Sequence, residues 1–555
     1  MVSWPTPGRL KDENRPSSFT ALAKLIKQSL SGFETLQSLI VAMTITIQIQ
    51  SRTRVQPTCP PDLSQSVLLS ILDATHLTTG TAATILFYDA VERDIAHPPT
   101  PAALQTSLAR ALDAYPQWCG SLHRQPGRPG RLMLTFGGPA APGVAFIVAH
   151  ADCPLTQHLP TNRESVWDVS DFPEAKLLPD TPLSLTDLSD ASLPNLAIQI
   201  TTFSDGGLAV ALRIAHPLAD AHCLAGFALH WAATLNPPQN EPPQPTFDPQ
   251  QLDRHATRIP TDNTTTTTLP IHRYDPWISS EGCPLRGRWT QPPPEFGSLP
   301  LDPPGEPIPW HQWDPTAPVT QTVLHFTSHE LQNLWAEVDT EELTHHDTLL
   351  AHLWSCVTRA RRPSFPIQDP SEEDPEDIIY LTYALGLRKR LTPPLSPSFL
   401  GSPTISAAIP SSTGTVCSPE TNLSTLASHI RATVSQFTPT RIATYLHDKI
   451  HEECPHRYWP GFMGRRHLMV TSWVGTRLYE VDFGMGRPRY VKGVMPQLDG
   501  MVLVMEGSPR MPVKKMTHWM RYGVDVMVCL DADVMGRLLQ DPVLWRFRDT
   551  TAGVI

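Results

Sequence analysis

Leu208 to Trp231 read LAVALRIAHPLADAHCLAGFALHW, and this stretch holds a strand, a histidine and a helix in immediate succession. Apolar residues alternate along its first half and place His216 on the same strand face, at the point where Pro217 prevents further pairing. The next apolar residues recur at helical spacing, so a helix is predicted to begin at about Asp220. The histidine is therefore expected at the end of a rigid strand, where loops often present catalytic groups.

An imidazole in this position could serve as a general base, because its unperturbed pKa of about 6.5 lets it accept a hydroxyl proton near neutral pH. A structural interpretation stays open beside the catalytic one. Asp220 would be an ordinary helix N-cap, and a histidine on an apolar strand face is often a core residue. The chain has 22 histidines, so a His-x-x-x-Asp pattern is also expected about once by chance.

A second motif lies far downstream, where Asp482 to Gly486 read DFGMG. Two glycines around one bulky residue suit a tight turn, and alone this motif could be structural. Together with His216-Pro217-Leu218-Ala219-Asp220, it resembles the two signatures of the BAHD superfamily of acyl-CoA-dependent acyltransferases, His-x-x-x-Asp and Asp-Phe-Gly-Trp-Gly. In particular, the chain resembles the fungal branch that includes trichothecene 3-O-acetyltransferases.

Further stretches carry the same resemblance, in the right order, over most of the chain. Leu104 to Leu122, which ends YPQWCGSL, resembles the first helix of the family and the turn after it. Thr344 to Arg361 resembles the helix that opens the second lobe. Leu387 to Leu391, with Gly401 beyond it, is similar to the arginine-containing strand and the following loop. Ordered matches of this kind are more specific than either signature alone.

The resemblance implies an α/β fold of two similar lobes of the chloramphenicol-acetyltransferase type, with a channel between them and His216 near its middle. Acyl-CoA would enter from one face and a small-molecule acceptor from the other. His216 would deprotonate a hydroxyl or amine of the acceptor, which attacks the thioester directly without an acyl-enzyme. The expected activity is transfer of an acyl group, most simply from acetyl-CoA, to a hydroxyl of a hydrophobic secondary metabolite, with no bound cofactor.

The resemblance also implies roles for the other motif residues. Asp220 would point away from the channel and pair with an arginine, for which Arg388 and Arg390 are the candidates. The downstream turn would be structural and would maintain the C-terminal lobe and the CoA entrance, through Asp482, Gly484 and Gly486. The segment before it usually approaches the thioester, so it supplies candidates for oxyanion or substrate contacts, namely Thr471, Ser472 and Trp473.

Three residues depart from the family pattern. Met485 stands where tryptophan is usual, and Ser402 stands where asparagine is common after Gly401. Ala221 follows the aspartate where glycine is usual, and it could alter the loop because only glycine adopts positive φ cheaply. None of these departures removes a reacting group. The alternative function is a catalytically inactive relative that binds a ligand or a partner on the same scaffold.

The composition favours a globular, intracellular protein. Among 555 residues, 43 Lys and Arg against 54 Asp and Glu give a net charge of −11, which disfavours nucleic-acid binding. The nine cysteines form no Cys-x-x-Cys pair, which is typical of a reduced protein rather than a disulfide framework or zinc site. No apolar run reaches the roughly 18 residues that a membrane span needs. We expect a cytoplasmic monomer without a metal.

The 59 prolines, about twice the ordinary share, help to divide the chain. Residues 1–42 are expected to form an extension with an amphipathic helix, which could dock on the body or act as a membrane-surface or targeting element. A start at Met43 is a further hypothesis. Residues 43–235 and 317–555 are expected to form the two lobes, joined by a Pro-rich crossover with little regular structure over 236–316.

Hydrophobic periodicity predicts the main elements of the two lobes. Helices are expected over about 102–114 and 344–360, besides the helix from Asp220. Strands are expected from Met43 through Ile45, Ile47 and Ile49, and over 131–136, 144–149, 196–203, 208–215, 378–386, 467–473, 498–506 and 523–530.

Other chemistries fit the sequence less well. A condensation domain of a non-ribosomal peptide synthetase would have a second histidine where this chain has Ala215, and the Gly-x-Ser-x-Gly motif of a serine hydrolase does not occur. His451, Cys454 and His456 are close in sequence, but no distant pair completes a metal site. The pair Lys514-Lys515 could contact CoA phosphates, although adjacent lysines more commonly form a solvated basic turn.

Overall fold

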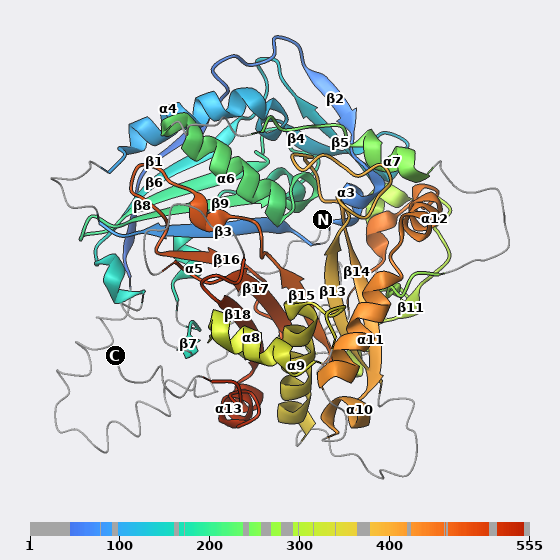
Figure 1. The fold of residues 1–555 in the computed structure, drawn as a ribbon. Helices are drawn as coiled ribbons and strands as arrows, with labels where there is room; N and C mark the ends of the chain where they lie inside the picture. Colours follow the sequence, from blue (N-terminus) through green and yellow to red (C-terminus); the bar gives the residue numbers. More distant parts are fainter. Residues whose placement is uncertain are drawn as a thin grey trace, which may run out of the picture.

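The computed structural model describes residues 45–548 except 78, 91–97, 160–165, 171, 237–242, 257–267, 279–291, 298, 313, 315, 339, 363–377, 419–422, 460, 462–463, 465 and 510–518. The described residues form two α/β lobes, one above the other in Figure 1, each built on its own sheet. The expected extension over 1–42, the start at Met43 and the pair Lys514-Lys515 lie outside the described residues.

The first lobe, uppermost in Figure 1, has a six-stranded sheet. In spatial order its strands are β1 (Ile47–Val55), β6 (Val144–Ala151), β8 (Leu196–Thr202), β9 (Leu208–Ala215), β3 (Thr81–Tyr88) and β16 (Tyr490–Gly493). Helices α4 (Pro101–Ala111) and α6 (Ala221–Leu235) pack together over this sheet, where Trp231 Nε1 donates to Ser107 Oγ at 3.0 Å. A small sheet completes the lobe, in the order β2 (Gln65–Leu68), β5 (Arg128–Phe136) and β4 (Ser121–Gln125).

The second lobe has a seven-stranded sheet with helices against it. In spatial order its strands are β14 (Thr404–Ser412), β13 (Ile378–Gly386), β15 (Leu468–Ser472), β17 (Met501–Glu506), β18 (Val524–Asp531), β12 (Val319–Phe326) and β7 (Val166–Asp168). The central helix α9 (His345–Arg361) contacts α8 (Ser328–Ala336), α10 (Thr413–Cys417), α11 (Leu423–Ser435) and α13 (Ala532–Gln540). Three further helices contact one another, α3 (Ile71–Thr75), α7 (Gln250–Ala256) and α12 (Pro439–Ile450).

Local sequence explains where the central elements begin and end. β9 alternates large and small apolar residues, and nearly all of them are buried. Pro217 has no backbone N–H and ends the ladder, and the Asp220 side chain caps α6 by accepting from the Cys223 N–H at 3.0 Å. α9 begins at a capping box, in which Thr344 Oγ1 and the Asp347 carboxylate each accept from the other residue's backbone N–H.

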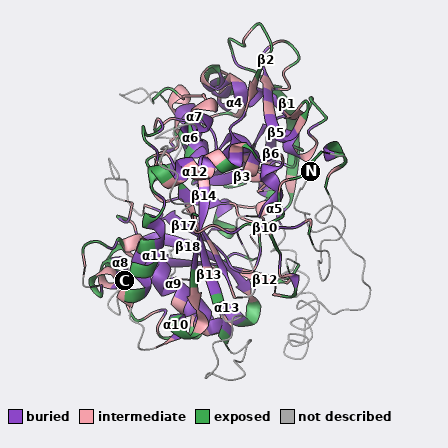
Figure 2. Ribbon diagram, turned by 90° about the vertical axis from the view of Figure 1, so that its right-hand side faces the viewer, coloured by how far each residue is buried: buried purple, intermediate pink, exposed green. Residues whose placement is uncertain are grey.

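Each lobe contributes one strand to the sheet of the other. β16, from the second half of the chain, pairs antiparallel with β3, and β7, from the first half, pairs antiparallel with β12. Neither sheet is therefore confined to one of the ranges 43–235 and 317–555, whose boundaries stay a prediction. Figure 2 shows the strands of both lobes largely in purple, so each sheet lies in a buried core.

Most of the predicted elements are confirmed. The helix over 102–114 is α4 continued by the 3-10 helix η1 (Leu112–Ala114), and the helix over 344–360 is α9. Each of the eight strands predicted between 131 and 530 is present within a few residues of its expected ends. The strand expected from Met43 begins, in its described part, only at Ile47 and continues to Val55.

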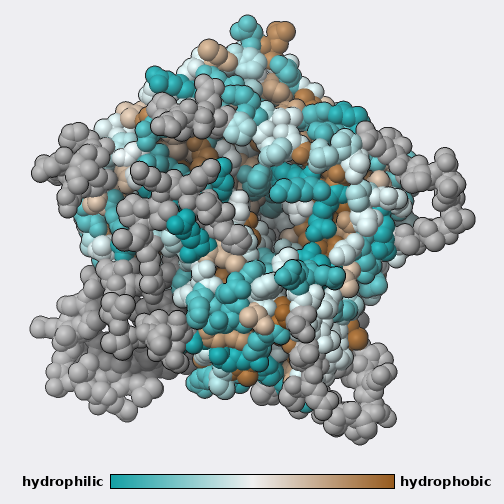
Figure 3. Space-filling model, in the orientation of Figure 1, coloured by the Kyte–Doolittle hydropathy of each residue, from teal (hydrophilic) through white to brown (hydrophobic). Residues whose placement is uncertain are grey.

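The described part of the range 236–316 has few regular elements. They include the seven-residue helix α7 and the short parallel pair β10 (Tyr274–Asp275) and β11 (Glu306–Pro307). The bounds of the Pro-rich crossover stay a prediction. Periodicity does not predict the inner strands β3 and β12 or the edge strand β14. The face seen in Figure 3 is mostly hydrophilic, with small brown apolar patches between the teal ones. No helix in the described part of the chain is both long and apolar enough to cross a bilayer.

Candidate active site

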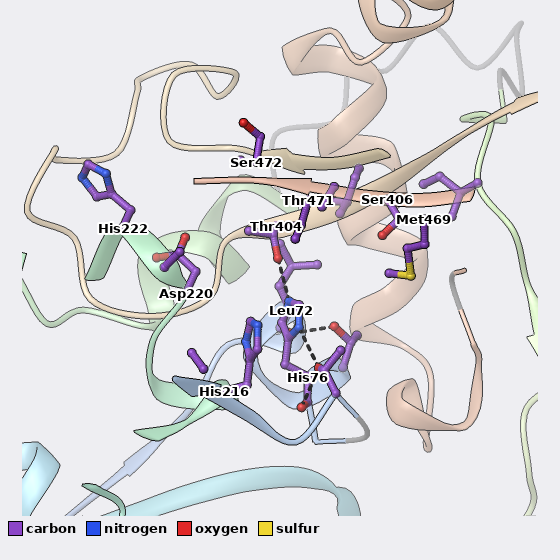
Figure 4. A pocket seen from close by; sticks show the side chains of 18 of the residues that line it. Leu72, His76, His216, Asp220, His222, Thr404, Ser406, Met469, Thr471 and Ser472 are labelled. Carbon is purple, nitrogen blue, oxygen red and sulfur yellow. Dashed lines mark hydrogen bonds between the residues drawn. The ribbon is translucent and has the colours of Figure 1, made fainter. Parts of the chain in front are cut away.

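A cavity of about 930 Å³ lies where the two lobes meet. The first half of the chain contributes His76 and His216 to its lining, and the second half contributes Thr404, Thr471 and Ser472. Figure 4 shows the two histidine rings side by side in this space. A cavity of this size suits a small molecule together with the reactive end of a second substrate.

His216 reaches the cavity at the end of β9. It begins the 3-10 helix η5 (His216–Leu218), and its N–H donates to Gly80 O at 3.0 Å, which holds its backbone. Its Nδ1 lies 3.1 Å from Ser402 Oγ, and the same hydroxyl donates to the His216 carbonyl. A hydroxyl has one proton, so Ser402 Oγ must accept from an Nδ1–H. The Nε2 is then unprotonated, and none of the described residues hydrogen-bonds to it.

The surroundings of His216 favour its neutral form. Burial lowers the pKa of this imidazole, and the nearby Asp220 carboxylate offsets that effect only in part. The charged form loses hydration in this position without gaining an ion pair. At neutral pH the imidazole is therefore in the state that can accept a proton.

Asp220 forms a buried ion pair that joins the two halves of the chain. Arg388 Nη1 and Nη2 lie 2.5 and 3.0 Å from its two carboxylate oxygens, and Nη2 also donates to Phe399 O at 3.1 Å. Burial opposes ionisation of Asp220, but the Arg388 charge and hydrogen bonds outweigh it and hold its pKa at about 2. Of the two expected partners, Arg388 is the one that pairs, whereas Arg390 donates to Val434 O. Asp220 and both arginines are among the residues that line the cavity, so Asp220 is not directed away from it as expected.

The loop that carries Ser402 is held by both neighbouring segments. Ser402 N donates to Asp73 Oδ1 at 2.7 Å, and Asp220 N donates to Gly401 O at 3.3 Å. Gly401 has a φ of 138°, and a Cβ there would lie 3.0 Å from Asp73 Oδ1, so the position requires glycine. Burial raises the pKa of Asp73 to about 7, although its hydrogen bonds favour the ionised form. The end of β9, the start of α6 and this loop are thus fixed relative to one another.

The downstream turn is not among the residues that line the cavity. Asp482 Oδ1 accepts from the N–H groups of Gly484 at 2.7 Å and Gly486 at 2.9 Å. Both glycines have positive φ, of 89° and 79°, which explains the residue type at each position. Phe483 is fully buried, and its ring centroid lies 4.7 Å from that of Trp231 in the first lobe. The turn therefore anchors the second half of the chain in the core of the first lobe.

Thr471, Ser472 and Trp473 lie at the end of β15 and just beyond it, and all three line the cavity. Ser472 Oγ lies 3.0 Å from Nε2 of His346, in the first turn of α9. Burial lowers the pKa of His346 to about 4, so this imidazole is neutral at physiological pH. Two hydroxyls and a buried indole thus share the cavity with His216.

No motif in the sequence marks His76 or Thr404. The His76 ring stacks on that of His216, with centroids 4.5 Å apart and 9° between the planes, and its Nε2 lies 2.9 Å from Thr404 Oγ1. His76 follows the five-residue helix α3, and Thr404 opens β14. The only local signal is the capping box of Ser70 and Asp73, which indicates the short helix but not what it faces.

The residues that depart from the family pattern fit the structure. Ala221 is the first residue of α6 and does not have positive φ, since Arg477 is the only described non-glycine residue that does. Met485 is partly buried against the core of the first lobe.

The cysteine and histidines near residue 454 do not form a metal site in the described part of the chain. Cys454 Sγ lies 3.5 Å from His456 Nε2, but no group of three possible metal ligands occurs among the residues that the structure describes.

Comparisons with known proteins agree with this architecture. The model of the Transferase family matches residues 45–275 and 320–543. Acyltransferase abl6 of Leptosphaeria maculans is 26% identical over 533 residues, which cover 90% of this chain and 98% of that protein.

Two solved structures show the likeness of the fold alone. The crystal structure of vinorine synthase matches with a TM-score of 0.61 at 19% identity and covers 91% of this chain and 99% of that one. The crystal structure of F. sporotrichioides TRI101 complexed with coenzyme A and T-2 has a TM-score of 0.58 at 16% identity, with 87% and 98% covered. The predicted two-lobed fold is thereby confirmed.

Proposed function

Since the chain belongs to the Transferase family and is an acyl-CoA-dependent acyltransferase of the BAHD type, we propose that it acylates a hydroxyl of a small hydrophobic metabolite, with acetyl-CoA as donor and His216 as general base. The observation that carries this proposal is the state of His216 in the cavity. Ser402 occupies its Nδ1, and its Nε2 has no hydrogen-bond partner among the described residues.

In the proposed reaction, the acceptor hydroxyl gives its proton to His216 Nε2 while its oxygen attacks the carbonyl carbon of the thioester. A C–O bond forms and the carbonyl becomes an oxyanion, whose collapse breaks the C–S bond. The departing sulfur of CoA takes the proton from Nε2, so the imidazole returns to its neutral form. Base catalysis of this kind contributes roughly 10²–10⁴-fold, and orientation of the two substrates must provide much of the rest.

The oxyanion needs a hydrogen-bond donor in the same cavity. We propose the hydroxyls of Thr471 and Ser472 and the indole of Trp473 for this contact or for contacts to the substrates. The Ser472 hydroxyl already has a hydrogen-bond partner, because Nε2 of the neutral His346 imidazole lies 3.0 Å from Ser472 Oγ. The proposal is supported by the position of all three residues in the cavity lining.

The lining of the cavity supports both classes of substrate. Trp459, Met469 and Met495 provide apolar surface for a hydrophobic acceptor. Lys389 and Arg390 provide local positive charge, which the phosphates of CoA need on a chain whose net charge is −11. TRI101, whose fold is similar, was crystallised with coenzyme A and T-2, a pairing that supports a CoA donor with a small-molecule acceptor.

We also propose that the enzyme acts in the cytoplasm. None of the cysteines that the structure describes is in a disulfide, which is typical of a reducing compartment. The monomeric state stays a prediction.

Release of the CoA thiol from acetyl-CoA, measured with a panel of hydroxylated acceptors, tests the function. His216→Ala should lower kcat by at least about 10²-fold, because the proton acceptor is lost, while the thermal midpoint changes little. His150→Ala is the matched control, since His150 hydrogen-bonds to Thr202 on the neighbouring strand and is not among the lining residues. Full activity of His216→Ala would exclude the proposed mechanism. Wild-type protein that binds acyl-CoA but transfers nothing would favour the inactive, ligand-binding alternative.

The acceptor can be identified by metabolite profiling of a strain that lacks the gene. We expect a precursor to accumulate that is lighter than the missing product by one acyl increment. The mass difference identifies the acyl group, and the precursor is the acceptor. A difference that corresponds to a longer acyl chain would correct the acetyl donor but keep the reaction type.

A further inference from the structure

We propose that His76 is a positioning residue for the general base, which holds the His216 ring in place and keeps water from its face. The inference rests on the proposed function of His216. The two imidazoles stack with their centroids 4.5 Å apart and their planes within 9° of parallel. Figure 4 shows both rings in the cavity, with the hydrogen bonds of His76 drawn as dashed lines. A stacked ring at this distance limits rotation of its neighbour about the Cβ–Cγ bond.

His76 is itself held by hydrogen bonds at both ring nitrogens. Its Nδ1 lies 3.0 Å from Thr79 Oγ1, and that hydroxyl donates to the His76 carbonyl at 2.9 Å. Thr79 must therefore accept from an Nδ1–H, which leaves Nε2 to accept from the Thr404 hydroxyl at 2.9 Å. With both nitrogens occupied, His76 is not available to take a proton from the substrate.

The two histidines are bound by the same arrangement. In each, one hydroxyl bridges Nδ1 and the carbonyl of the same residue, Thr79 for His76 and Ser402 for His216. They differ at Nε2. Thr404 occupies this atom in His76, whereas none of the described residues occupies it in His216. The geometry thus separates the pair into a rigid support and a proton acceptor.

Burial, more than the charges around the stack, keeps the His76 ring neutral. The titratable groups that face His216 are His76, the Asp220 carboxylate with its partner Arg388, and the Asp73 carboxyl behind the Ser402 loop. Burial lowers the pKa of His76 to about 3, and the neighbouring His216 adds to that effect. A neutral ring excludes water without repelling the imidazolium that forms on His216 during the reaction.

This role predicts a linked change in the orientation and the pKa of His216. Without the His76 ring, water can reach the face of His216, and the burial that lowers its pKa is relieved. The pKa of His216 should then rise toward its ordinary value of 6.5. The ring should also rotate more freely, which lowers the fraction of molecules in the reactive geometry.

The pH dependence of kcat/KM for thiol release from acetyl-CoA measures both effects. The second substrate is the acceptor that metabolite profiling identifies. In the wild type, kcat/KM should be constant near neutral pH and fall as the pH drops through a midpoint below 6.5, because the base must be unprotonated. In His76→Ala we expect a midpoint displaced upward and kcat/KM on its plateau reduced by about 10-fold to 100-fold. His76→Phe, which retains a ring of similar size, should recover most of the rate and the low midpoint.

A second measurement needs no turnover. The full-length protein labelled with ¹³C at histidine Cε1 reports each imidazole by NMR, and His216→Ala assigns the signal of interest. The ring current of His76 should displace the Hε1 resonance of His216 in the wild type. The phenyl ring of His76→Phe, whose ring current is stronger than that of imidazole, should displace this resonance at least as much. The displacement should be absent in His76→Ala. A pH titration of the same signal gives the pKa of His216 directly.

An unchanged midpoint and an unchanged His216 resonance in a folded His76→Ala protein would overturn the inference. If His76→Ala fails to fold, equal kcat/KM at all pH values in wild type and His76→Gln, which removes the aromatic ring, would overturn it instead. Failure of the proposed function is distinct, because a fully active His216→Ala would refute the base whatever the NMR titration shows.

Discussion

At the scale of single residues, the reactivity of His216 depends on one hydroxyl from the other half of the chain. Ser402 Oγ accepts from Nδ1–H and donates to the His216 carbonyl, so it selects the tautomer with an unprotonated Nε2. Asp220 does not serve this purpose, because its carboxylate oxygens are engaged by Arg388 and the Cys223 N–H. The tautomer is therefore controlled by a neutral group rather than by a carboxylate.

Ser402→Ala tests this assignment. Loss of the hydroxyl leaves Nδ1–H without its acceptor and allows the other tautomer, so kcat/KM should fall by about 10-fold or more. Ser402→Thr, which keeps the hydroxyl, should retain more activity than the alanine variant. Ser411→Ala, toward the far end of the strand β14 that follows the Ser402 loop, controls for the loss of a serine hydroxyl elsewhere in the second lobe. Wild-type kcat/KM in Ser402→Ala over the whole pH range would contradict the assignment.

Residues of the site differ in how far the sequence reveals them. His216 and Asp220 could be predicted because a strand ends and a helix begins within five residues of each other. Arg388 was one of two candidates, and only the structure distinguishes it from Arg390. His76 and Thr404 could not be predicted, since each reaches the cavity through long-range packing and neither stands in a motif.

At the scale of elements, the pair of Asp220 and Arg388 joins the start of α6 to the segment after β13. Both side chains are nearly buried, with 9% and 11% exposed. Arg388→Met would leave the Asp220 carboxylate buried without its counter-charge, and we expect the free energy of unfolding to fall by about 3–5 kcal/mol. Arg390→Met is the matched control, because the Val434 carbonyl is the only acceptor of Arg390 among the residues that the structure describes. Urea unfolding measures both variants.

The same pair predicts how the loss depends on pH. The pKa of Asp220 is about 2 in the folded protein, below its ordinary value of 3.8. Its contribution to stability is therefore complete above about pH 4 and is lost as the pH falls toward 2. The difference in unfolding free energy between wild type and Arg388→Met should shrink over this range. A difference that does not change with pH would show that the ion pair is not its cause.

Periodicity revealed only some of the elements, for a physical reason. β9 and α6 could be predicted because a clear alternation gives way to helical spacing at Pro217. β3 is buried on both faces and its mostly apolar residues do not alternate with polar ones, so sequence alone cannot separate it from a buried helix. β14 contains Pro410, and β16 has only four residues, one of them Lys492, so neither pattern indicates a strand of a large sheet.

At the scale of the whole molecule, exchange of β7 and β16 makes the two lobes one structure. The sequence indicated a single connection through the Pro-rich range 236–316, because it shows the order of elements but not which sheet a short strand joins. Lys492 on β16 is the clearest link. Its side chain is 1% exposed, and its Nζ lies 3.0 Å from Gln321 Oε1 on β12 and 3.2 Å from Glu174 Oε2 in α5 (Glu174–Leu177).

Lys492→Met should therefore destabilise both lobes together. The substitution leaves the largely buried Glu174 carboxylate without its cation, and we expect a loss of about 3 kcal/mol in the free energy of unfolding. Fluorine-labelled tryptophan reports each lobe separately by NMR, through Trp231 in the core of the first lobe and Trp354 in that of the second. Both native signals should disappear at the same, lower urea concentration.

Lys176→Met provides the control for this experiment, because Lys176 is an exposed lysine that donates to the Ile45 carbonyl. It should leave both midpoints within about 0.5 kcal/mol of the wild type. If the signal of Trp231 disappeared at lower urea than that of Trp354 in Lys492→Met, the lobes would unfold independently despite the exchanged strands. Coincident midpoints in both proteins would instead show that the cavity between the lobes forms only when the whole chain is folded.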